Sequence, residues 1–160
     1  MVPAETLQIA LLALFCCLLA IAAVSDLWSR RIPNVLCLAG IALYPFILLT
    51  DFAPTPWWGG LAVGLAVFAF GALLFALAVF GGGDVKLVSV AAAWAGPALV
   101  AELLLATALA GGALALVKLL RLQLEPIGGS PPGSGQAAVL PYGVAIAVGG
   151  FWTAYRLSGV

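Results

Sequence analysis

The sequence predicts an all-α fold: a polytopic membrane protein of six transmembrane helices, forming a single domain over residues 1–160. Composition is the first observation behind this prediction. Hydrophobic residues make up 65% of the chain and charged residues 8%, whereas soluble domains are roughly half apolar and about a quarter charged. Spacing is the second observation, because the apolar residues fall into runs close to the ~20 residues that a membrane-spanning helix needs.

The first three spans follow from the apolar runs and the polar segments between them. Residues 7–24 form the first run, and the polar segment "SDLWSRRIPN" separates it from a shorter second run at 35–49. The turn-rich segment "TDFAPTPWWGG" leads into the third run at 60–80. Because the first run exceeds the 7–15 apolar residues of a secretory signal, we expect it to be retained as a span.

In the second half of the chain, the length of an apolar run indicates where the spans lie. Residues 85–120 are nearly all apolar, and at ~1.5 Å per residue they would form about 54 Å of helix. This is too long for one crossing of a ~30 Å core, so we expect two helices, the first one short, broken near "AGP" at 95–97. Residues 121–136 are rich in Gly, Pro and Ser, and we expect them to form a cytoplasmic loop. The final span is expected at 137–155, interrupted near its start by "LPYG".

Composition also excludes several kinds of site. The chain has no histidine, which removes triads that use histidine and HExxH metalloprotease sites. Cys16, Cys17 and Cys37 form no CxxC pair, so we expect no metal site, no disulfide framework and no cofactor. The formal net charge is zero and there is no basic run, so nucleic-acid binding is not expected either.

The cations predict the orientation of the chain. Placing the N-terminus outside the cytoplasm leaves only Arg156 outside, as the positive-inside rule requires, and makes both termini extracytoplasmic. The cations on the cytoplasmic side are then Arg30, Arg31, Lys86, Lys118 and Arg121. All five tryptophans, Trp94 included, are expected at the membrane interfaces.

Two aspartates are predicted to meet at the cytoplasmic face. Asp26 lies at the end of the first span and Asp84 follows the third, so two crossings return the chain to the same side. Asp51 falls on the opposite side, and Glu125 lies in the predicted loop. A charged carboxylate at membrane depth costs about 2.5–3.5 kcal/mol on insertion scales, which makes such a residue a functional candidate.

Paired carboxylates have a specific chemistry. When two of them approach within a few Å, repulsion favours a state in which they share one proton. One can then act as general base on a water while the other, protonated, polarises a peptide carbonyl. This is the chemistry of an aspartic protease, and it requires no histidine, metal or cofactor.

The residues next to Asp84 leave alternatives open. Gly81, Gly82 and Gly83 could permit positive φ values and the close approach of another backbone, or they could form a helix C-cap and turn. Lys86 could act on Asp84 or on a substrate carbonyl, or it could extend to the cytoplasmic face as an anchor. A serine–lysine pair of Lys86 with Ser89 would leave both aspartates unexplained.

Two proline segments flank the predicted site. Pro33 and Asn34 predict an extended residue before the proline and an N-cap for the second helix, which would also fix where Asp26 points. In the second segment, Pro141 precedes Tyr142 and Gly143. Tyr142 could donate a hydrogen bond towards the site or lie at the membrane interface.

Three segments together resemble a known family. "GGGDVKL" contains the GxGD signature of polytopic membrane aspartic proteases, with Gly81, Gly83 and Asp84 in its fixed positions. "DLWSRRIPN" resembles the aspartate, basic and "IPN" segment of type IV prepilin peptidases. "LPYGVAIAVGG" resembles their C-terminal "PYG" segment, and the order and spacing of all three agree over almost the whole chain.

The resemblance implies an activity. It implies an endopeptidase of the bacterial inner membrane that removes the basic leader of prepilin-like proteins at the cytoplasmic face, with Asp26 and Asp84 as its catalytic pair and no cofactor. Larger members carry a cytoplasmic segment with paired CxxC motifs and also methylate the new N-terminus. This chain is similar in size instead to short members that serve tight-adherence (Flp) pilus systems, or to the archaeal preflagellin peptidases, and "RRIPN" and "PYG" favour the bacterial group. We therefore expect peptidase activity without methylation.

Two other classes of protein remain open at this point. A small ion-coupled transporter or channel subunit could use the aspartates as a cation or proton site, and it would lose ion flux in an Asp84→Asn variant. An assembly scaffold could pack through small-residue faces such as "GGLAVGLAVFAFG", and it would tolerate alanine at both aspartates. The sequence leaves the oligomeric state and the identity of the pilin open.

Overall fold

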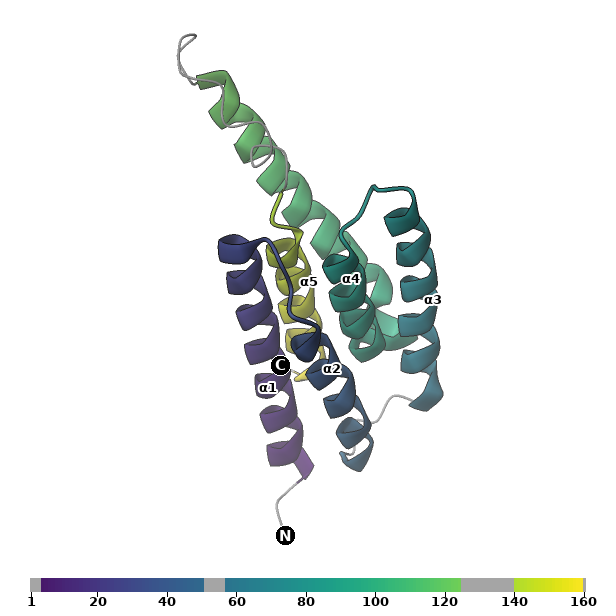
Figure 1. The fold of residues 1–160 in the computed structure, drawn as a ribbon. Helices are drawn as coiled ribbons and strands as arrows, with labels where there is room; N and C mark the ends of the chain where they lie inside the picture. Colours follow the sequence, from purple (N-terminus) through teal and green to yellow (C-terminus); the bar gives the residue numbers. More distant parts are fainter. Residues whose placement is uncertain (1–3, 51–56, 125–139, 160) are drawn as a thin grey trace.

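The described part of the chain is a bundle of helices. The structure is a computed structural model, and it describes residues 4–50, 57–124 and 140–159, among which there is no strand. The elements are α1 (Ala4–Ser29), α2 (Asn34–Leu43), the 3-10 helix η1 (Tyr44–Leu49), α3 (Trp57–Ala76), α4 (Gly82–Leu124) and α5 (Tyr142–Leu157). They lie side by side in Figure 1, and the all-α prediction is confirmed.

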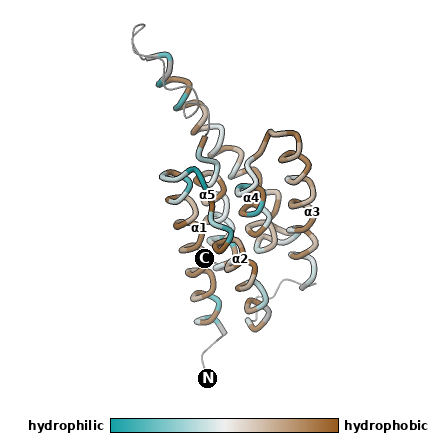
Figure 2. The backbone as a smooth tube through the Cα atoms, in the orientation of Figure 1, coloured by the Kyte–Doolittle hydropathy of each residue, from teal (hydrophilic) through white to brown (hydrophobic). Residues whose placement is uncertain are grey.

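Several helices are suited to a bilayer. Glu5–Ser29, Trp58–Ala76 and Gly82–Arg121 are long and apolar enough to cross a membrane, and Asn34–Ile47 is a shorter apolar helix. In Figure 2 hydrophobic colours run along these helices, while hydrophilic colours mark the link from α1 to α2 and the start of α4. The chain is therefore a membrane protein. Among the described residues three helices meet the length and composition of a span, so the predicted number of six is not confirmed.

The helix α4 consists of two arms that meet at Gly96. Gly96 has φ 60° and ψ −173°, a backbone conformation that glycine adopts readily and other residues do not. Pro97 follows and cannot donate a backbone hydrogen bond to the preceding turn. Figure 1 shows the chain reversing its direction there, with the first arm shorter than the second. The predicted break at 95–97 is confirmed.

Helices α1 and α5 pack antiparallel, and hydrogen bonds join them near both ends. The Gln8 side-chain amide donates to the Leu157 carbonyl at 2.7 Å, and the Gly143 N–H donates to Asp26 Oδ2 at 2.8 Å. Between these ends, a Cβ at Gly150 would meet the side chain of Leu19. Small residues thus allow these two helices to approach closely, as is common where helices pack in membranes.

Glu102, for which the sequence offers no account, joins the second arm of α4 to the end of α5. Its carboxylate forms an ion pair with Arg156 at 2.6 Å and accepts a hydrogen bond from Trp152 Nε1 at 2.9 Å. Because Arg156 lies near the C-terminus of α5 and Gly143 at its start, this ion pair is at the opposite end of α5 from Asp26.

Trp94 lies in the core, so its predicted place at the interface is wrong. Its side chain is 1% exposed and stacks on Phe15, with ring centroids 4.4 Å apart and planes within 9°. Tyr44 packs edge-on against the same indole. The indole N–H donates to the Gly40 carbonyl at 3.0 Å, which satisfies the one polar group that would oppose burial.

Some predicted boundaries also change. The helix α4 continues to Leu124, so residues 121–124 of the predicted loop are helical. The remainder of that loop, residues 125–136, and the first residues of the last predicted span lie outside the described residues, as do Asp51 and Glu125. α3 ends at Ala76, four residues before the predicted end of its span.

Replacing Trp94 with alanine should destabilise the bundle. The variant leaves a cavity beside Phe15 and removes the hydrogen bond to Gly40, so we expect the free energy of unfolding to fall by about 3–5 kcal/mol. Trp58→Ala is the matched control, because Trp58 is 56% exposed and should change stability by roughly 0.5 kcal/mol or less. Denaturant unfolding in detergent micelles measures both, and equal losses would contradict a core role for Trp94.

Candidate active site

Asp26 lies in the last turn of α1, where the chain turns sharply. Its side chain is 7% exposed. Arg30 has φ 53° and ends the helix, and its N–H donates to the Asp26 carbonyl at 3.1 Å. The hydroxyl of Ser25 donates to the Arg31 carbonyl at 2.8 Å, which holds the link to α2 against α1. This contact was not predicted from the sequence, although a serine next to Asp26 at a helix end is a recognisable signal.

The "PYG" segment provides the partner of Asp26. The Tyr142 N–H donates to the Leu140 carbonyl at 2.9 Å, which closes a three-residue turn centred on Pro141. This turn starts α5. The first amides of a helix have no partner inside it, and one of them, the Gly143 N–H, donates to the buried Asp26 carboxyl. A Cβ at position 143 would lie 2.9 Å from the Asp26 Cβ, so the contact requires glycine.

Asp84 lies in the first turn of α4. The Val85 N–H donates to the Gly81 carbonyl at 3.0 Å, which is the first hydrogen bond of this helix. The half-buried Asp84 side chain folds back towards Gly81, where an added Cβ would lie 2.6 Å from Asp84 Oδ2. Within the described residues no donor is hydrogen-bonded to this carboxyl, so it remains available to a substrate or a water.

Neither the positive φ values nor the C-cap predicted for the three glycines is found, and the close approach of another backbone stays a prediction. None of Gly81, Gly82 and Gly83 has a positive φ. They are not the C-cap of α3 either, because Ala78 takes that left-handed position with φ 57°. They begin α4 instead and leave room for neighbouring side chains. A Cβ at Gly83, for example, would lie 3.2 Å from the Ile32 Cβ.

Asp26 and Asp84 line the same cavity, which has a volume of about 290 Å³. We call it the acidic cavity. Its other lining residues are Arg30, Arg31, Ile32, Asn34, Gly81, Gly82 and Gly83. The two aspartates therefore form a pair of carboxyl groups that face one space. Such a pair can hold a water between a base and an acid, which is the arrangement that hydrolysis requires.

Asn34 lines the acidic cavity, but it does not cap α2 as predicted. Pro33, with φ −60° and ψ 131°, is the N-cap residue, and Asn34 is the first residue of the helix. The Asn34 side chain accepts a hydrogen bond from Lys86 Nζ at 2.9 Å. Lys86 is exposed and lies outside the cavity lining. The Ser89 hydroxyl donates to the Val85 carbonyl at 2.6 Å, so it is not paired with Lys86.

Tyr142 lies beside the acidic cavity without lining it. Its ring packs against Phe80 with centroids 5.4 Å apart, and its side chain is 37% exposed. Among the residues that the structure describes, its hydroxyl makes no hydrogen bond towards either aspartate. Pro141 and Gly143 therefore contribute to the site through the backbone, whereas Tyr142 contributes to the surface next to it.

These features define a helical membrane protein with a paired-carboxyl cavity at one end of its bundle. The sequence profile of the type IV leader peptidase family matches residues 13–116, and the chain belongs to this family. The match includes both Asp26 and Asp84 and ends before Gly143. Searches of curated proteins and of solved structures found no match. The resemblance drawn from the sequence is confirmed, and membership indicates a protease that acts on leader peptides.

Gly143→Ala should impair the peptidase while a matched glycine variant should not. The new Cβ displaces the Asp26 carboxyl, and a displacement of about 1 Å at a reacting group costs roughly 10²-fold in rate. Gly112→Ala is the control, because a Cβ there meets nothing within 4 Å. Leader cleavage by the two purified variants measures the effect. Wild-type activity in Gly143→Ala would contradict the role assigned to this contact.

Proposed function

We propose that the chain is an aspartic endopeptidase that removes the leader peptide of prepilin-like proteins, with Asp26 and Asp84 as its catalytic pair. The observation that carries this proposal is the acidic cavity, where two carboxyl groups 58 positions apart in the sequence face one small space. Membership of the leader peptidase family supports the same reaction. The transporter alternative has no comparable support.

The surroundings of the two carboxyl groups differ, and this difference supports a separate role for each. Asp26 accepts a buried hydrogen bond from the Gly143 N–H at 2.8 Å, and such a bond is stronger when the acceptor is ionised. No donor among the described residues reaches the Asp84 carboxyl. Asp26 is therefore the carboxylate that acts as general base, and Asp84 carries the shared proton and acts as general acid.

The reaction then proceeds in two balanced steps. The water oxygen attacks the carbonyl carbon of the scissile peptide, its proton passes to Asp26, and the Asp84 proton passes to the carbonyl oxygen. When the tetrahedral intermediate collapses, the C–N bond breaks and the leaving nitrogen takes the proton from Asp26. Asp84 recovers its proton from the hydroxyl of the intermediate, which becomes the new carboxyl group. No metal or cofactor takes part in either step.

The glycines at 81–83 give the substrate access to the pair. A peptide must lie extended beside both carboxyl groups, and these three lining residues have no side chains to block it. The cavity volume of about 290 Å³ admits only a few residues at a time. The narrow space therefore favours cleavage of an exposed, extended segment over cleavage of a folded domain.

The charges support an orientation with the acidic cavity at the cytoplasmic face of the bacterial inner membrane. Arg30 and Arg31 line this cavity, whereas Arg156 is paired with Glu102 at the other end of α5. The positive-inside rule then makes both termini extracytoplasmic. A precursor that is itself anchored in the membrane would enter from the side, with its basic leader remaining in the cytoplasm.

Asp26→Asn and Asp84→Asn should each abolish processing of a co-expressed precursor. Each variant removes one partner of the acid–base pair, so we expect cleavage to fall by about 10²–10⁴-fold. Glu102→Gln is the matched control, because it removes a carboxylate at the far end of α5 and should retain activity. Near wild-type processing by either aspartate variant would contradict the mechanism. Ion flux in vesicles that is lost in Asp84→Asn, without any cleavage, would support a transporter instead.

The orientation can be tested separately. A reporter enzyme that is active only outside the cytoplasm, joined to the C-terminus, should be active in cells because the last span ends on the extracytoplasmic side. The same reporter inserted at 125–136 should be inactive. The reverse pattern would contradict the proposed orientation without affecting the chemistry of the aspartates.

A further inference from the structure

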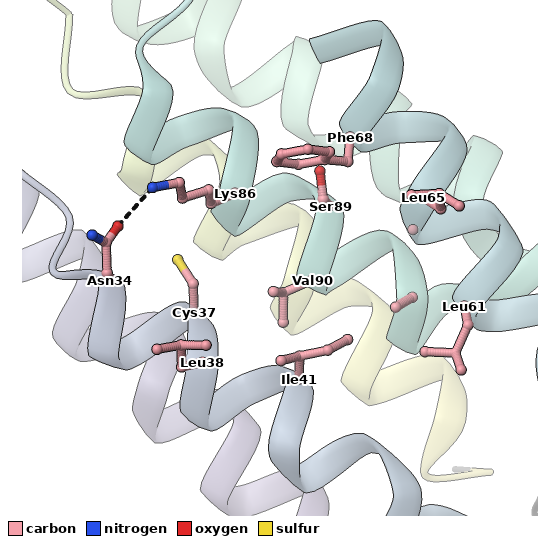
Figure 3. Close-up of a pocket in the computed structure, with 12 residues that line it drawn as sticks. Asn34, Cys37, Leu38, Ile41, Leu61, Leu65, Phe68, Lys86, Ser89 and Val90 are labelled. Carbon is pink, nitrogen blue, oxygen red and sulfur yellow. Dashed lines mark hydrogen bonds between the residues drawn. The ribbon is translucent and has the colours of Figure 1, made fainter. Parts of the chain in front are cut away.

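An apolar groove adjoins the acidic cavity. It has a volume of about 510 Å³ and lies between α2, α3 and the first arm of α4, as Figure 3 shows. Each helix contributes one stripe of residues spaced i, i+3, i+4 and i+7, such as Asn34, Cys37, Leu38 and Ile41 of α2. A stripe of this spacing is about 10 Å long. We call this feature the side groove.

The side groove is polar at one end and apolar along the rest. Lys86 Nζ donates to Asn34 Oδ1 at its polar end, as the dashed line in Figure 3 shows. Beyond this pair most of the wall is apolar, with Ile41 on α2 and Leu65 on α3 among the lining residues, and the hydroxyl of Ser89 is hydrogen-bonded to its own helix. Leu65 is 68% exposed, so its side chain is free to meet a partner inside the bilayer.

The side groove and the acidic cavity share a lining residue. Asn34 lines both the acidic cavity and the side groove, and Lys86 follows Asp84 by two positions on the same helix. The other large space, about 660 Å³ between α3 and the second arm of α4, shares no lining residue with the acidic cavity. A chain that leaves the aspartates towards the membrane therefore meets Asn34 and Lys86 before it meets the apolar walls.

We propose that the side groove binds the apolar helix that follows the scissile bond of the substrate, an inference that rests on the proposed function. The order of chemistry along the groove matches such a polypeptide. Peptide carbonyls next to the cleaved bond accept hydrogen bonds from Lys86 and Asn34, and apolar side chains of the helix then enter the groove at i, i+3, i+4 and i+7. A volume of about 510 Å³ is in the range of binding pockets and holds side chains from one face of a helix.

A crosslinking experiment distinguishes the side groove from the space on the other face of α3. Leu65 lines the side groove and Phe70 lines the other space, and their side chains are 68% and 65% exposed. In an Asp84→Asn background, benzoylphenylalanine at position 65 should capture an uncut precursor through its apolar segment, and the same probe at position 70 should not. Capture at position 70 alone, or capture of lipid alone at position 65, would overturn the proposal.

Kinetics separate a failure of this proposal from a failure of the proposed function. Two substrates are compared: the full precursor, and a short peptide that spans the scissile bond without the apolar segment. Leu65→Trp should lower kcat/KM for the precursor by roughly tenfold more than for the peptide, because a misfit in an apolar pocket costs about that much. Phe70→Trp, the matched control, should cleave both as the wild type does.

Each outcome has one meaning. If the wild type cleaves neither substrate, the proposed function is wrong. If the wild type cleaves both and Leu65→Trp affects them equally, the enzyme stands and the side groove does not bind the apolar segment. Because Leu65 is largely exposed, its replacement leaves the helix packing in place, and the crosslinking result does not depend on the activity of any variant.

Discussion

The hydrogen bond from the Gly143 N–H to Asp26 is the interaction on which the arrangement of the site depends. It joins residues 117 positions apart at 2.8 Å, in a buried environment. A buried carboxylate without a donor would be strongly unfavourable, and hydrogen bonds to charged groups contribute about 1.5–3 kcal/mol. The donor is a backbone amide, so the hydrogen bond requires that a helix start at this place and that the turn at Pro141 create this start. It also requires a glycine, because the missing Cβ leaves space for Asp26. The antiparallel packing of α1 and α5 satisfies all three conditions.

Three helix N-termini converge on the acidic cavity, and this convergence explains how a membrane protein without histidine holds two acidic groups together. Helix α5 begins at the Asp26 carboxyl, α4 begins two residues before Asp84, and α2 begins at Asn34 in the cavity lining. The free amides and the dipole of each terminus favour negative charge. The same positive potential would favour the oxyanion that develops when a peptide is attacked. The backbone thus provides the electrostatic environment that histidines or metals provide in other hydrolases.

The sequence predicted the features that the membrane imposes, and it missed those that depend on contacts between distant residues. Counting crossings was enough to bring Asp26 and Asp84 to one end, because each span must reverse the side on which the chain emerges. The break in α4 was predicted for a similar reason, because the apolar run at 85–120 is too long for one crossing and contains a Gly–Pro pair. The position of the glycines was not accessible, since the chain leaves α3 through Ala78, in a left-handed conformation that local preference would assign to glycine. Likewise, the burial of Trp94 depends on a hydrogen bond from its indole N–H to the carbonyl of Gly40, which is 54 positions away in the sequence.

The parallel course of α2 and the first arm of α4 connects the chemistry of the site to the lipid boundary. Asn34 contacts Lys86 near the start of both helices, and Gly40 contacts Trp94 farther along, so the two helices enter the bundle in the same direction. Both sequences change from polar to apolar along that direction, which makes the space between them polar beside the aspartates and apolar below. A soluble peptide could satisfy only the polar end, whereas a membrane-anchored chain satisfies both. Under the proposed function, the fold would select a substrate by the point at which its sequence changes from polar to apolar, and the acidic cavity lies at the polar end of that space.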